Sequence, residues 1–314
     1  MNSSQKKIKV NKNTGPRFKR TAGDVIFNII NYTVFILFAI TCIFPFYYLF
    51  INTISDNELV STGQITFLPR GLHLDNYISL FNVDGLVLST FVSIARTVLG
   101  TVFNVLASAF IAYLLTKEEM WGQKHINRFF LITMYFNTGL IPAYLNMSKL
   151  GLTNNFWGYI IPGIVSAFNI ILVKTYINSI PGELEESAMI DGAGYFKRFT
   201  AIIFPLCKPV LATIAIFTAV GHWNNFTDSM IYMSGKPKLY TLQYILYIYM
   251  NSSSNLGAMM ESGGAIPETA IKQTLNMRSM QYTVAMFTMI PILLVYPFMQ
   301  RYFTKGILLG SVKG

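Results

Sequence analysis

Long uncharged runs of hydrophobic residues recur along the chain, and six of them are long enough to cross a lipid bilayer. A transmembrane helix needs about 20 largely apolar residues to cross a hydrocarbon core roughly 30 Å thick. The six predicted spans cover residues 25–51, 90–116, 129–147, 156–174, 208–227 and 281–301. The pattern therefore predicts an all-α, polytopic membrane protein with six transmembrane helices.

Residues that disfavour straight, apolar helices lie within or beside several of these runs. The third run is broken by Asn137, Gly139 and Pro142, the fifth is preceded by Pro205 and Pro209, and the sixth contains Pro291 and Pro297. Broken helices persist at membrane depth where they surround a cavity or pack on protein, although ordinary proline kinks explain them equally well. Arg96 and Lys174 lie near run ends, where we expect their charged groups to extend to the membrane surface.

The composition supports a location in lipid. Only 12% of the 314 residues are charged and the mean hydropathy is +0.45, which excludes most soluble folds and excludes disorder. The net charge of +10 fits Lys and Arg retained at the cytoplasmic face, so we expect no nucleic-acid partner. Cys42 and Cys207 lie far apart, and the histidines complete no metal-ligand motif.

The distribution of Lys and Arg orients the predicted spans. Seven basic residues precede residue 25, which places the N-terminus inside the cell. Alternation puts the C-terminus inside as well, and puts the long connection 228–278 outside despite its four basic residues. The expected organisation is a basic cytoplasmic segment (1–24), a transmembrane domain (25–303) and a cytoplasmic tail (304–314).

One predicted cytoplasmic loop, residues 179–204, is more patterned than a connector requires. It begins with a proline and three acidic residues, as helices often do: Pro181, Glu183, Glu185 and Glu186. Asp191 and Gly192 are expected to end this first helix. A second short helix is indicated by apolar residues at helical spacing, Phe196, Phe199, Ile202 and Ile203. Lys197 and Arg198 are expected on its opposite face, and the two helices form a rigid protrusion suited to a partner's groove.

This loop resembles the cytoplasmic signature of importer permeases of the ATP-binding-cassette (ABC) superfamily. The signature reads EAA, three residues, G, nine residues, I, one residue, LP. The corresponding positions here are Glu186, Ser187, Ala188, Gly192, Ile202, Phe204 and Pro205, with Ser187 and Phe204 departing from it. The flanking Asp191, Ala193, Leu206 and Pro209 are similar to the carbohydrate-importer version.

Other segments extend the resemblance over most of the chain. Residues 136–145, 150–152 and 220–224 are similar to a polysaccharide-type (LplC/YtcP-like) branch of the carbohydrate uptake family, related to the MalG subunit of the maltose importer. The chain end resembles the MalG-like tail, which in that family reaches between two ATPase subunits. The tail residues implied to contact the ATPases are Ser311, Val312, Lys313 and Gly314.

The resemblance implies a MetI-like ABC importer permease that moves an oligosaccharide or polysaccharide fragment into a bacterial cell. The implied partners in the cell membrane are a second six-span permease subunit, two ATPase subunits, a lipid-anchored or periplasmic solute-binding protein, the carbohydrate and membrane lipid. ATP and Mg²⁺ belong to the ATPase subunits and no cofactor to this chain, whose sequence has no GxxxxGK[ST] phosphate loop, so we expect no enzymatic activity of its own.

The coupling loop carries specific roles under this resemblance. Gly192 sets the angle between its helices, Glu186 and Asp191 offer charge to the ATPase, and Phe196 and Phe199 anchor the bend. The full set of implied coupling residues is Glu185, Glu186, Ser187, Ala188, Asp191, Gly192, Ala193, Phe196, Phe199, Ile202 and Pro205.

Aromatic and amide side chains near the predicted spans are candidates for sugar contact, because sugars bind to aromatic faces and hydrogen-bonding amides. The candidates are Tyr135, Asn137, Tyr144, Asn146, Trp223 and Asn224. Interface belts or packing are an alternative explanation. Outside the membrane, residues 56–84 and a helical face with Leu242, Ile245, Leu246 and Tyr249 are expected either to support the binding protein or to cap the partner subunit.

Two other classes of membrane protein remain as alternatives at this point. An ion-coupled secondary sugar transporter usually has carboxylates within its spans, and the six uncharged runs contain no Asp or Glu. An intramembrane enzyme needs a clustered nucleophile and base or metal ligands, and no HExxH or GxSxG motif occurs.

Overall fold

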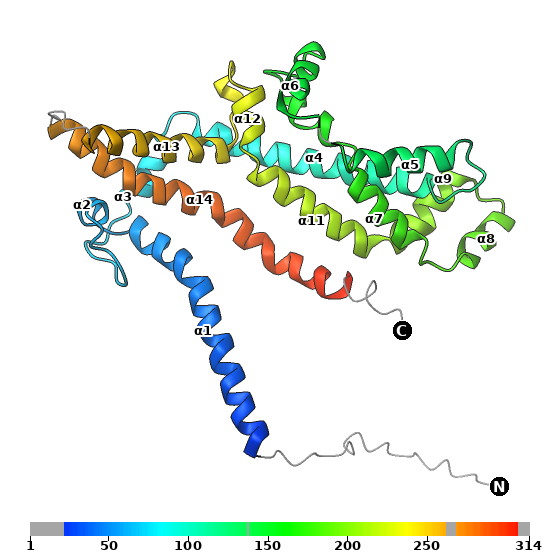
Figure 1. Ribbon diagram of the computed structural model, residues 1–314, viewed down its shortest axis with the longest axis horizontal. Helices are drawn as coiled ribbons and strands as arrows, with labels where there is room; N and C mark the ends of the chain where they lie inside the picture. The colour runs from blue at the N-terminus through cyan, green and yellow to red at the C-terminus, as the bar shows by residue number, and fades with distance from the viewer. Residues whose placement is uncertain (1–21, 137, 262–267, 307–314) are drawn as a thin grey trace, which may run out of the picture. The chain divides into compact units, whose positions relative to one another are not determined.

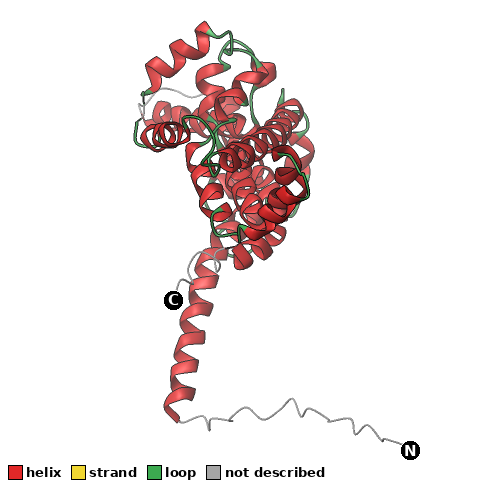
Figure 2. Cartoon of the chain, turned by 90° about the vertical axis from the view of Figure 1, so that its right-hand side faces the viewer, coloured by secondary structure: helices red, strands yellow, loops and turns green. Residues whose placement is uncertain are grey.

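A computed structural model of the chain describes residues 22–136, 138–261 and 268–306 (Figure 1). Side chains are described throughout these ranges except at 252–261, 268–276, 298–299 and 301–306. Every regular element in the described ranges is a helix, and none of these residues forms a strand, which confirms the all-α prediction (Figure 2). The chain falls into two units, residues 1–48 and 49–314, and each is considered by itself.

The described part of the first unit belongs to a single long helix. Helix α1 (Ala22–Thr53) begins here and ends in the second unit. Between Val25 and Phe38 every large apolar side chain is exposed, as Phe27 and Phe38 illustrate with 68% and 66%. A helix that is apolar on all sides is stable when lipid or another subunit surrounds it, so α1 fits the first predicted span.

Two short helices follow α1 in the second unit, within the connection that was expected outside the membrane. Helix α2 (Asn57–Ser61) begins at Asp56, whose carboxylate accepts hydrogen bonds from the backbone N–H groups of Glu58 and Leu59 at 2.9 and 3.3 Å. Helix α3 (Asp75–Leu80) leads into the next long helix.

Three helices form the centre of the second unit. Helix α4 (Leu86–Leu114) packs along α11 (Lys208–Asn224) and against α7 (Ala167–Ile177). Their contact surface combines small and β-branched residues, so the backbones approach closely: Ala109, Ala112, Ile170, Val173 and Ile214 are all buried in one cluster.

Two further helices cover another side of α4 and α11. Helix α13 (Leu242–Glu261) packs against α14 (Glu268–Gly306), and α14 also contacts α11 and α2. Leu242 and Ile245 of α13 are buried against Trp223 and Val284, with Leu246 and Tyr249 packed beside them. The expectation that this face of α13 receives a binding protein or a partner subunit is therefore wrong, because the chain's own helices cover it.

The third predicted span is divided between two helices. Helix α5 (Gln123–Thr133) ends within the first part of this segment, and α6 (Leu140–Lys149) starts after Gly139. Gly139 has φ +79° and ψ 173°, a conformation with positive φ that glycine adopts without steric cost. Residues 129–147 thus do not form one continuous helix, in agreement with the predicted interruption.

The fourth predicted span is bent, and a bend precedes the fifth. The short helices η1 (Phe156–Tyr159) and η2 (Ile161–Gly163) meet α7 at 43°, and the helical segment Tyr195–Leu206 meets α11 at 78°. Three helices of the described chain are long and apolar enough to cross a membrane by themselves, Ala22–Thr53, Leu86–Leu114 and Met277–Pro297, or up to five spans result if each bent pair is one. The chain is therefore built to cross the membrane several times.

A buried polar network holds the break between η2 and α7. The Asn104 amide on α4 donates to the backbone carbonyl of Gly163 at 2.7 Å, and its oxygen accepts from the Asn169 amide at 2.8 Å. Thr218 of α11 joins them, accepting from Asn169 at 3.2 Å. Carbonyls freed by a helix break need such partners where water is absent.

Candidate functional site

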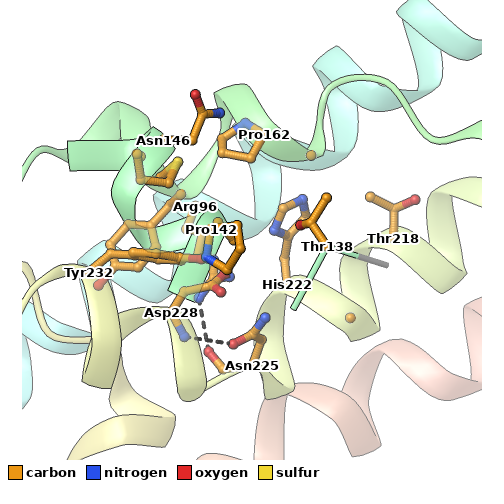
Figure 3. Close-up of a pocket in the computed structure, with 16 residues that line it drawn as sticks. Arg96, Thr138, Pro142, Asn146, Pro162, Thr218, His222, Asn225, Asp228 and Tyr232 are labelled. Atoms are coloured by element: carbon orange, nitrogen blue, oxygen red, sulfur yellow. Dashed lines mark hydrogen bonds and ion pairs between the residues drawn. The ribbon is translucent and has the colours of Figure 1, made fainter. Parts of the chain in front are cut away.

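A pocket of about 680 Å³ lies within the second unit, between α4, α6, η1, η2, α11 and α12 (Thr227–Tyr232). Figure 3 shows polar side chains from different helices around it. Those used below are Arg96, Thr138, Asn146, His222, Asn225 and Asp228. Its size is within the range of roughly 300–1,000 Å³ that small-molecule sites occupy.

Arg96 is the most deeply buried cation of the pocket wall. Its side chain is 1% exposed, its guanidinium forms an ion pair with Asp228, and Nη1 donates to the Asn225 carbonyl at 2.9 Å. The guanidinium also lies 4.6 Å from the centre of the Tyr159 ring, a cation–π contact. The prediction that Arg96 extends to the membrane surface is wrong, because a counter-ion, a carbonyl and an aromatic ring hold it inside the helical bundle.

The end of α11 explains how Asp228 reaches Arg96. Asn225 leaves the helical conformation, with φ −79° and ψ 105°, which directs its carbonyl out of the helix toward Arg96. Its side-chain oxygen accepts from the Asp228 backbone N–H at 3.0 Å, so the turn into α12 is fixed. Figure 3 shows Arg96, Asn225 and Asp228 linked in this way.

His222 lines the pocket from α11 and packs on two glycines. A Cβ atom built on Gly100 of α4 would lie 2.4 Å from His222 Nε2, and one on Gly163 would lie 3.5 Å from His222 Cε1. The imidazole therefore occupies space that only a residue without a side chain at position 100 leaves free.

The predicted sugar contacts are distributed unevenly around this pocket. Asn146 lines it, and Tyr144 stacks on the pocket residue Tyr232 with ring centres 6.3 Å apart and planes at 10°. Tyr135 and Asn224 are exposed and do not line it. Trp223 is buried and donates its indole N–H to the Thr288 carbonyl at 3.1 Å, so it packs against α14 instead. Asn137 lies outside the described residues.

Sequence reasoning missed the centre of the pocket, which is the Arg96–Asp228 pair with Asn225 and His222. A signal was present, because a charged residue in an apolar run needs a partner and Asp228 follows the fifth run directly. Lys174, the basic residue at the end of the fourth run, donates to the Asn127 side chain of α5 at 2.8 Å.

The second candidate site is the patterned loop. Its first helix, α8 (Glu183–Ile190), ends as predicted at Asp191 and Gly192, and Gly192 has φ +78°. The Gly192 N–H donates to the Met189 carbonyl at 3.0 Å and the Ala193 N–H to the Ala188 carbonyl at 2.9 Å. These two bonds are a Schellman motif, which fixes the direction in which the chain leaves the helix.

Glu185 ties α8 to the rest of the protein. Its carboxylate accepts a hydrogen bond from Tyr113 at 2.8 Å, forms an ion pair with Lys117, and lies 3.3 Å from Arg198 Nη1. Burial alone raises the pKa of Glu185, but the bonds from Lys117 and Tyr113 and the charges of Lys117 and Arg198 outweigh it and hold that pKa below its usual value.

The second helix of the loop buries a different face from the predicted one. It consists of α9 (Tyr195–Arg198), the π-helical turn η3 (Phe199–Ile203) and α10 (Phe204–Leu206). Arg198, Phe199 and Ile203 are buried, whereas Phe196 is 69% exposed. Two expectations are wrong: Arg198 does not face away from the apolar side, and Phe196 does not anchor the bend within this chain. A π-helical turn places i and i+5 in register, which changes the face expected from α-helical spacing.

The remaining coupling residues divide into exposed and partly buried sets. Glu186, Ser187 and Asp191 are exposed, and Ala188, Ala193, Ile202 and Pro205 are partly buried. Phe199 is packed against Phe110 and Phe204, with ring centres 5.4 and 5.7 Å apart. The side chains of Met189 and Ile190 are exposed as well, and that of Ile190 is 87% exposed. The tail residues Ser311, Val312, Lys313 and Gly314 lie outside the described residues.

Several membrane-crossing helices, a polar pocket among them and an exposed protrusion define a membrane transport protein. Comparison with known proteins makes the class specific. No protein-family model matches the chain. It is 36% identical, over 92% of its length and 99% of the relative's, to the polygalacturonan/rhamnogalacturonan transport system permease protein YtcP of Bacillus subtilis. It is 35% identical to the protein LplC of the same organism, over 87% and 90% of the two chains.

A solved structure agrees with these relatives. The crystal structure of a bacterial ABC transporter involved in the import of the acidic polysaccharide alginate contains a chain with a TM-score of 0.73 and 30% identity, covering 90% of this chain and 98% of that one. The chain therefore belongs to the permease subunits of ABC importers for sugars and polysaccharides. Membership of this family sets aside the secondary transporter and the intramembrane enzyme.

Proposed function

We propose that this chain is one of two membrane subunits of a binding-protein-dependent ABC importer, which moves an oligosaccharide or a polysaccharide fragment into the cell. Two ATPase subunits, which bind ATP and Mg²⁺, drive the transport from the cytoplasm. A lipid-anchored or periplasmic binding protein delivers the carbohydrate from outside. The relatives, which are named as transport permeases and include a polysaccharide transporter, support this proposal.

The proposed topology has six spans, with both termini in the cytoplasm. Three long helices supply three spans, η1, η2 and α7 together supply the fourth, α11 supplies the fifth, and the pair α5 and α6 supplies the remaining one. This order places α8 and α9 on the cytoplasmic side and α12 and α13 outside. The permease domain is 25–303, between the basic segment 1–24 and the tail 304–314, whose last four residues reach the ATPases.

The observation that carries the coupling role is the exposed apolar surface at the Gly192 turn. Met189, Ile190 and Phe196 project from α8 and α9, while Glu185 and Phe199 fasten the same helices to α4 and α11. Large exposed apolar side chains on a firmly held element are typical of a docking surface. In this proposal they enter a groove of the ATPase, with Glu186 and Asp191 at its rim.

The pocket serves as this subunit's part of the carbohydrate path. Transport then alternates between two packings of the helices, and nucleotide binding at the ATPases shifts the balance between them. Sugar contact comes from Asn146 and from the stacked pair of Tyr144 and Tyr232. Tyr135, Trp223 and Asn224 do not line the pocket and have no direct sugar contact in this proposal, while Asn137 stays a predicted contact.

The docking surface is tested by co-purification. The variant Ile190→Ser/Phe196→Ser, with an affinity tag on this chain, is expected to retain at least tenfold less ATPase subunit than the wild type. The control is Leu72→Ser, which removes an equally exposed apolar side chain from the connection after α1. Full ATPase recovery and sugar-stimulated ATP hydrolysis in the double variant would refute the coupling role of this loop.

A further inference from the structure

The two charges at the centre of the pocket are unequally accessible. The Arg96 side chain is 1% exposed, whereas that of Asp228 is 27% exposed. Arg96 meets the Oδ2 atom of Asp228, and Oδ1 accepts no hydrogen bond from the residues that the structure describes. The ion pair therefore acts as a dipole with its negative end toward the cavity.

The other polar side chains around the cavity are amides, hydroxyls and one imidazole. The amides belong to Asn146 and Asn225, the hydroxyls to Thr138, Thr218, Tyr159 and Tyr232, and the imidazole to His222. Among the lining residues that the structure describes, Arg96 and Asp228 are the only Asp, Glu, Lys or Arg. A ligand that enters thus meets a carboxylate oxygen that can accept hydrogen bonds, while the Arg96 guanidinium is 1% exposed and already bonded to Asp228 and the Asn225 carbonyl.

We propose that this pocket binds an uncharged pyranose unit and discriminates against a uronate. Sugar hydroxyls donate hydrogen bonds to Asp228 Oδ1, and the Asn146 amide bonds a further hydroxyl. A uronate carboxylate is repelled by Asp228 and cannot reach Arg96 unless it displaces a buried ion pair. This inference rests on the proposed function, in which the pocket belongs to the carbohydrate path.

The proposed preference for an uncharged sugar differs from the substrates that the names of two similar proteins state. One relative is named for polygalacturonan and rhamnogalacturonan, and the similar structure is of a transporter for acidic alginate. Under our proposal, an acidic fragment passes this subunit with its neutral groups toward the pocket, or is not the cargo of this importer.

The experiment compares two forms of one oligosaccharide. The tagged chain, purified in lipid nanodiscs with the subunits that accompany it and without the binding protein, is titrated with tetragalacturonate and with its fully methyl-esterified form. The two ligands share ring stereochemistry and linkage and differ in charge. Affinities are measured at pH 7 by competition in saturation-transfer NMR. We expect the ester to bind at least tenfold more tightly.

Two variants test whether the Arg96–Asp228 ion pair causes the preference for the ester. Arg96→Gln/Asp228→Asn replaces both charges with amides of similar shape, and is expected to reduce the preference to less than threefold. Asn146→Ala removes one neutral contact and is expected to lower the affinities for both ligands by the same factor. Both variants are checked for unaltered recovery of the assembled complex.

Each outcome decides one of the two proposals. Equal or tighter binding of the free acid by the wild type overturns the neutral-sugar inference, and so does an unchanged preference in the double variant. If Asn146→Ala and the double variant both leave each affinity unaltered, the pocket is not on the carbohydrate path and that part of the proposed function fails. A preference for the ester that the double variant removes supports the inference.

Discussion

Arg96 of α4 and Asp228 of α12 form a buried ion pair although they are 132 positions apart in the chain. The pair joins the N-terminal half of α4 to the segment that follows α11. At its C-terminal end, α4 carries Tyr113, which donates to Glu185 of the loop helix α8 at 2.8 Å. One continuous helix thus connects the pocket wall to the proposed ATPase-docking surface.

The first prediction concerns the unequal burial of this pair. Asp228→Leu leaves the 1% exposed Arg96 without a counter-ion and is expected to cost about 3–5 kcal/mol of stability. Arg96→Met is expected to lower the stability by less, because the Asp228 carboxylate is 27% exposed and stays hydrated. The double variant is expected to be more stable than Asp228→Leu alone. Thermal unfolding of the purified complex measures these differences.

The control for these variants is Arg70→Met, which removes an exposed arginine outside the bundle. It is expected to leave the unfolding temperature within about a degree of the wild type's, since most surface substitutions have small effects. Equal stability losses in Arg70→Met and Asp228→Leu would show that the buried pair has no structural role.

The second prediction uses the contact between Gly100 and His222. Gly100→Ala places a methyl group 2.4 Å from the present position of His222 Nε2, so the imidazole must move. Overpacking of this kind typically costs about 1–3 kcal/mol, and we expect sugar-stimulated ATP hydrolysis to fall with it. The control for overpacking is Gly221→Ala on α11, where an added Cβ meets nothing within 4 Å, although Gly221 also lines the pocket. Equal thermal stability in the two variants contradicts this account.

The central helices and the loop were predictable from the sequence because their signals are local. The uncharged run near α4 is long, and the Asp191–Gly192 helix end depends on the glycine's own conformational freedom. The pocket was not predictable in the same way. The Arg96–Asp228 pair and the burial of Trp223 depend on which helices meet in space, which the pattern of apolar residues along one helix does not specify.

The buried face of α9 and η3 shows a second limit. Its apolar spacing was interpreted with α-helical geometry, and the π-helical turn from Phe199 to Ile203 changes which side chains point inward. Arg198 becomes buried because Glu185 and the Tyr195 ring, 4.3 Å from its guanidinium, compensate its charge. The compensating carboxylate comes from another helix, α8, so hydrophobic periodicity could not predict it.

The third prediction concerns the helix break beside the pocket. Asn104→Leu retains the side-chain size but removes the donor to the Gly163 carbonyl and the acceptor for the Asn169 amide. Each polar group left buried without a partner costs about 1–3 kcal/mol, so we expect a clear decrease in thermal stability. Thr175→Val serves as a comparison, because it removes an exposed, local bond to the Ile171 carbonyl. A decrease no larger than that of Thr175→Val argues against a role for the network.

The fourth prediction concerns pH and the Glu185 cluster. The pKa of Glu185 is lowered in the folded protein, so its ionised form stabilises the fold above its unfolded pKa of about 4.5, and this contribution is lost as the pH falls through the lower folded value. Glu185→Gln is therefore expected to be less stable than the wild type at pH 7 and to lose less stability on acidification below about 4.5.

Unfolding temperatures of the complex in nanodiscs between about pH 3.5 and 7 test this sign. Glu186→Gln is the neighbouring control, because Glu186 is exposed and belongs to the proposed docking surface rather than to the cluster. It is expected to follow the wild-type pH profile while reducing ATPase recovery. Glu185→Gln is expected to change the profile because Lys117 and Arg198 then keep their charges without the carboxylate that joins α8 to α4. Parallel profiles for Glu185→Gln and the wild type would mean that this carboxylate does not hold the loop in place.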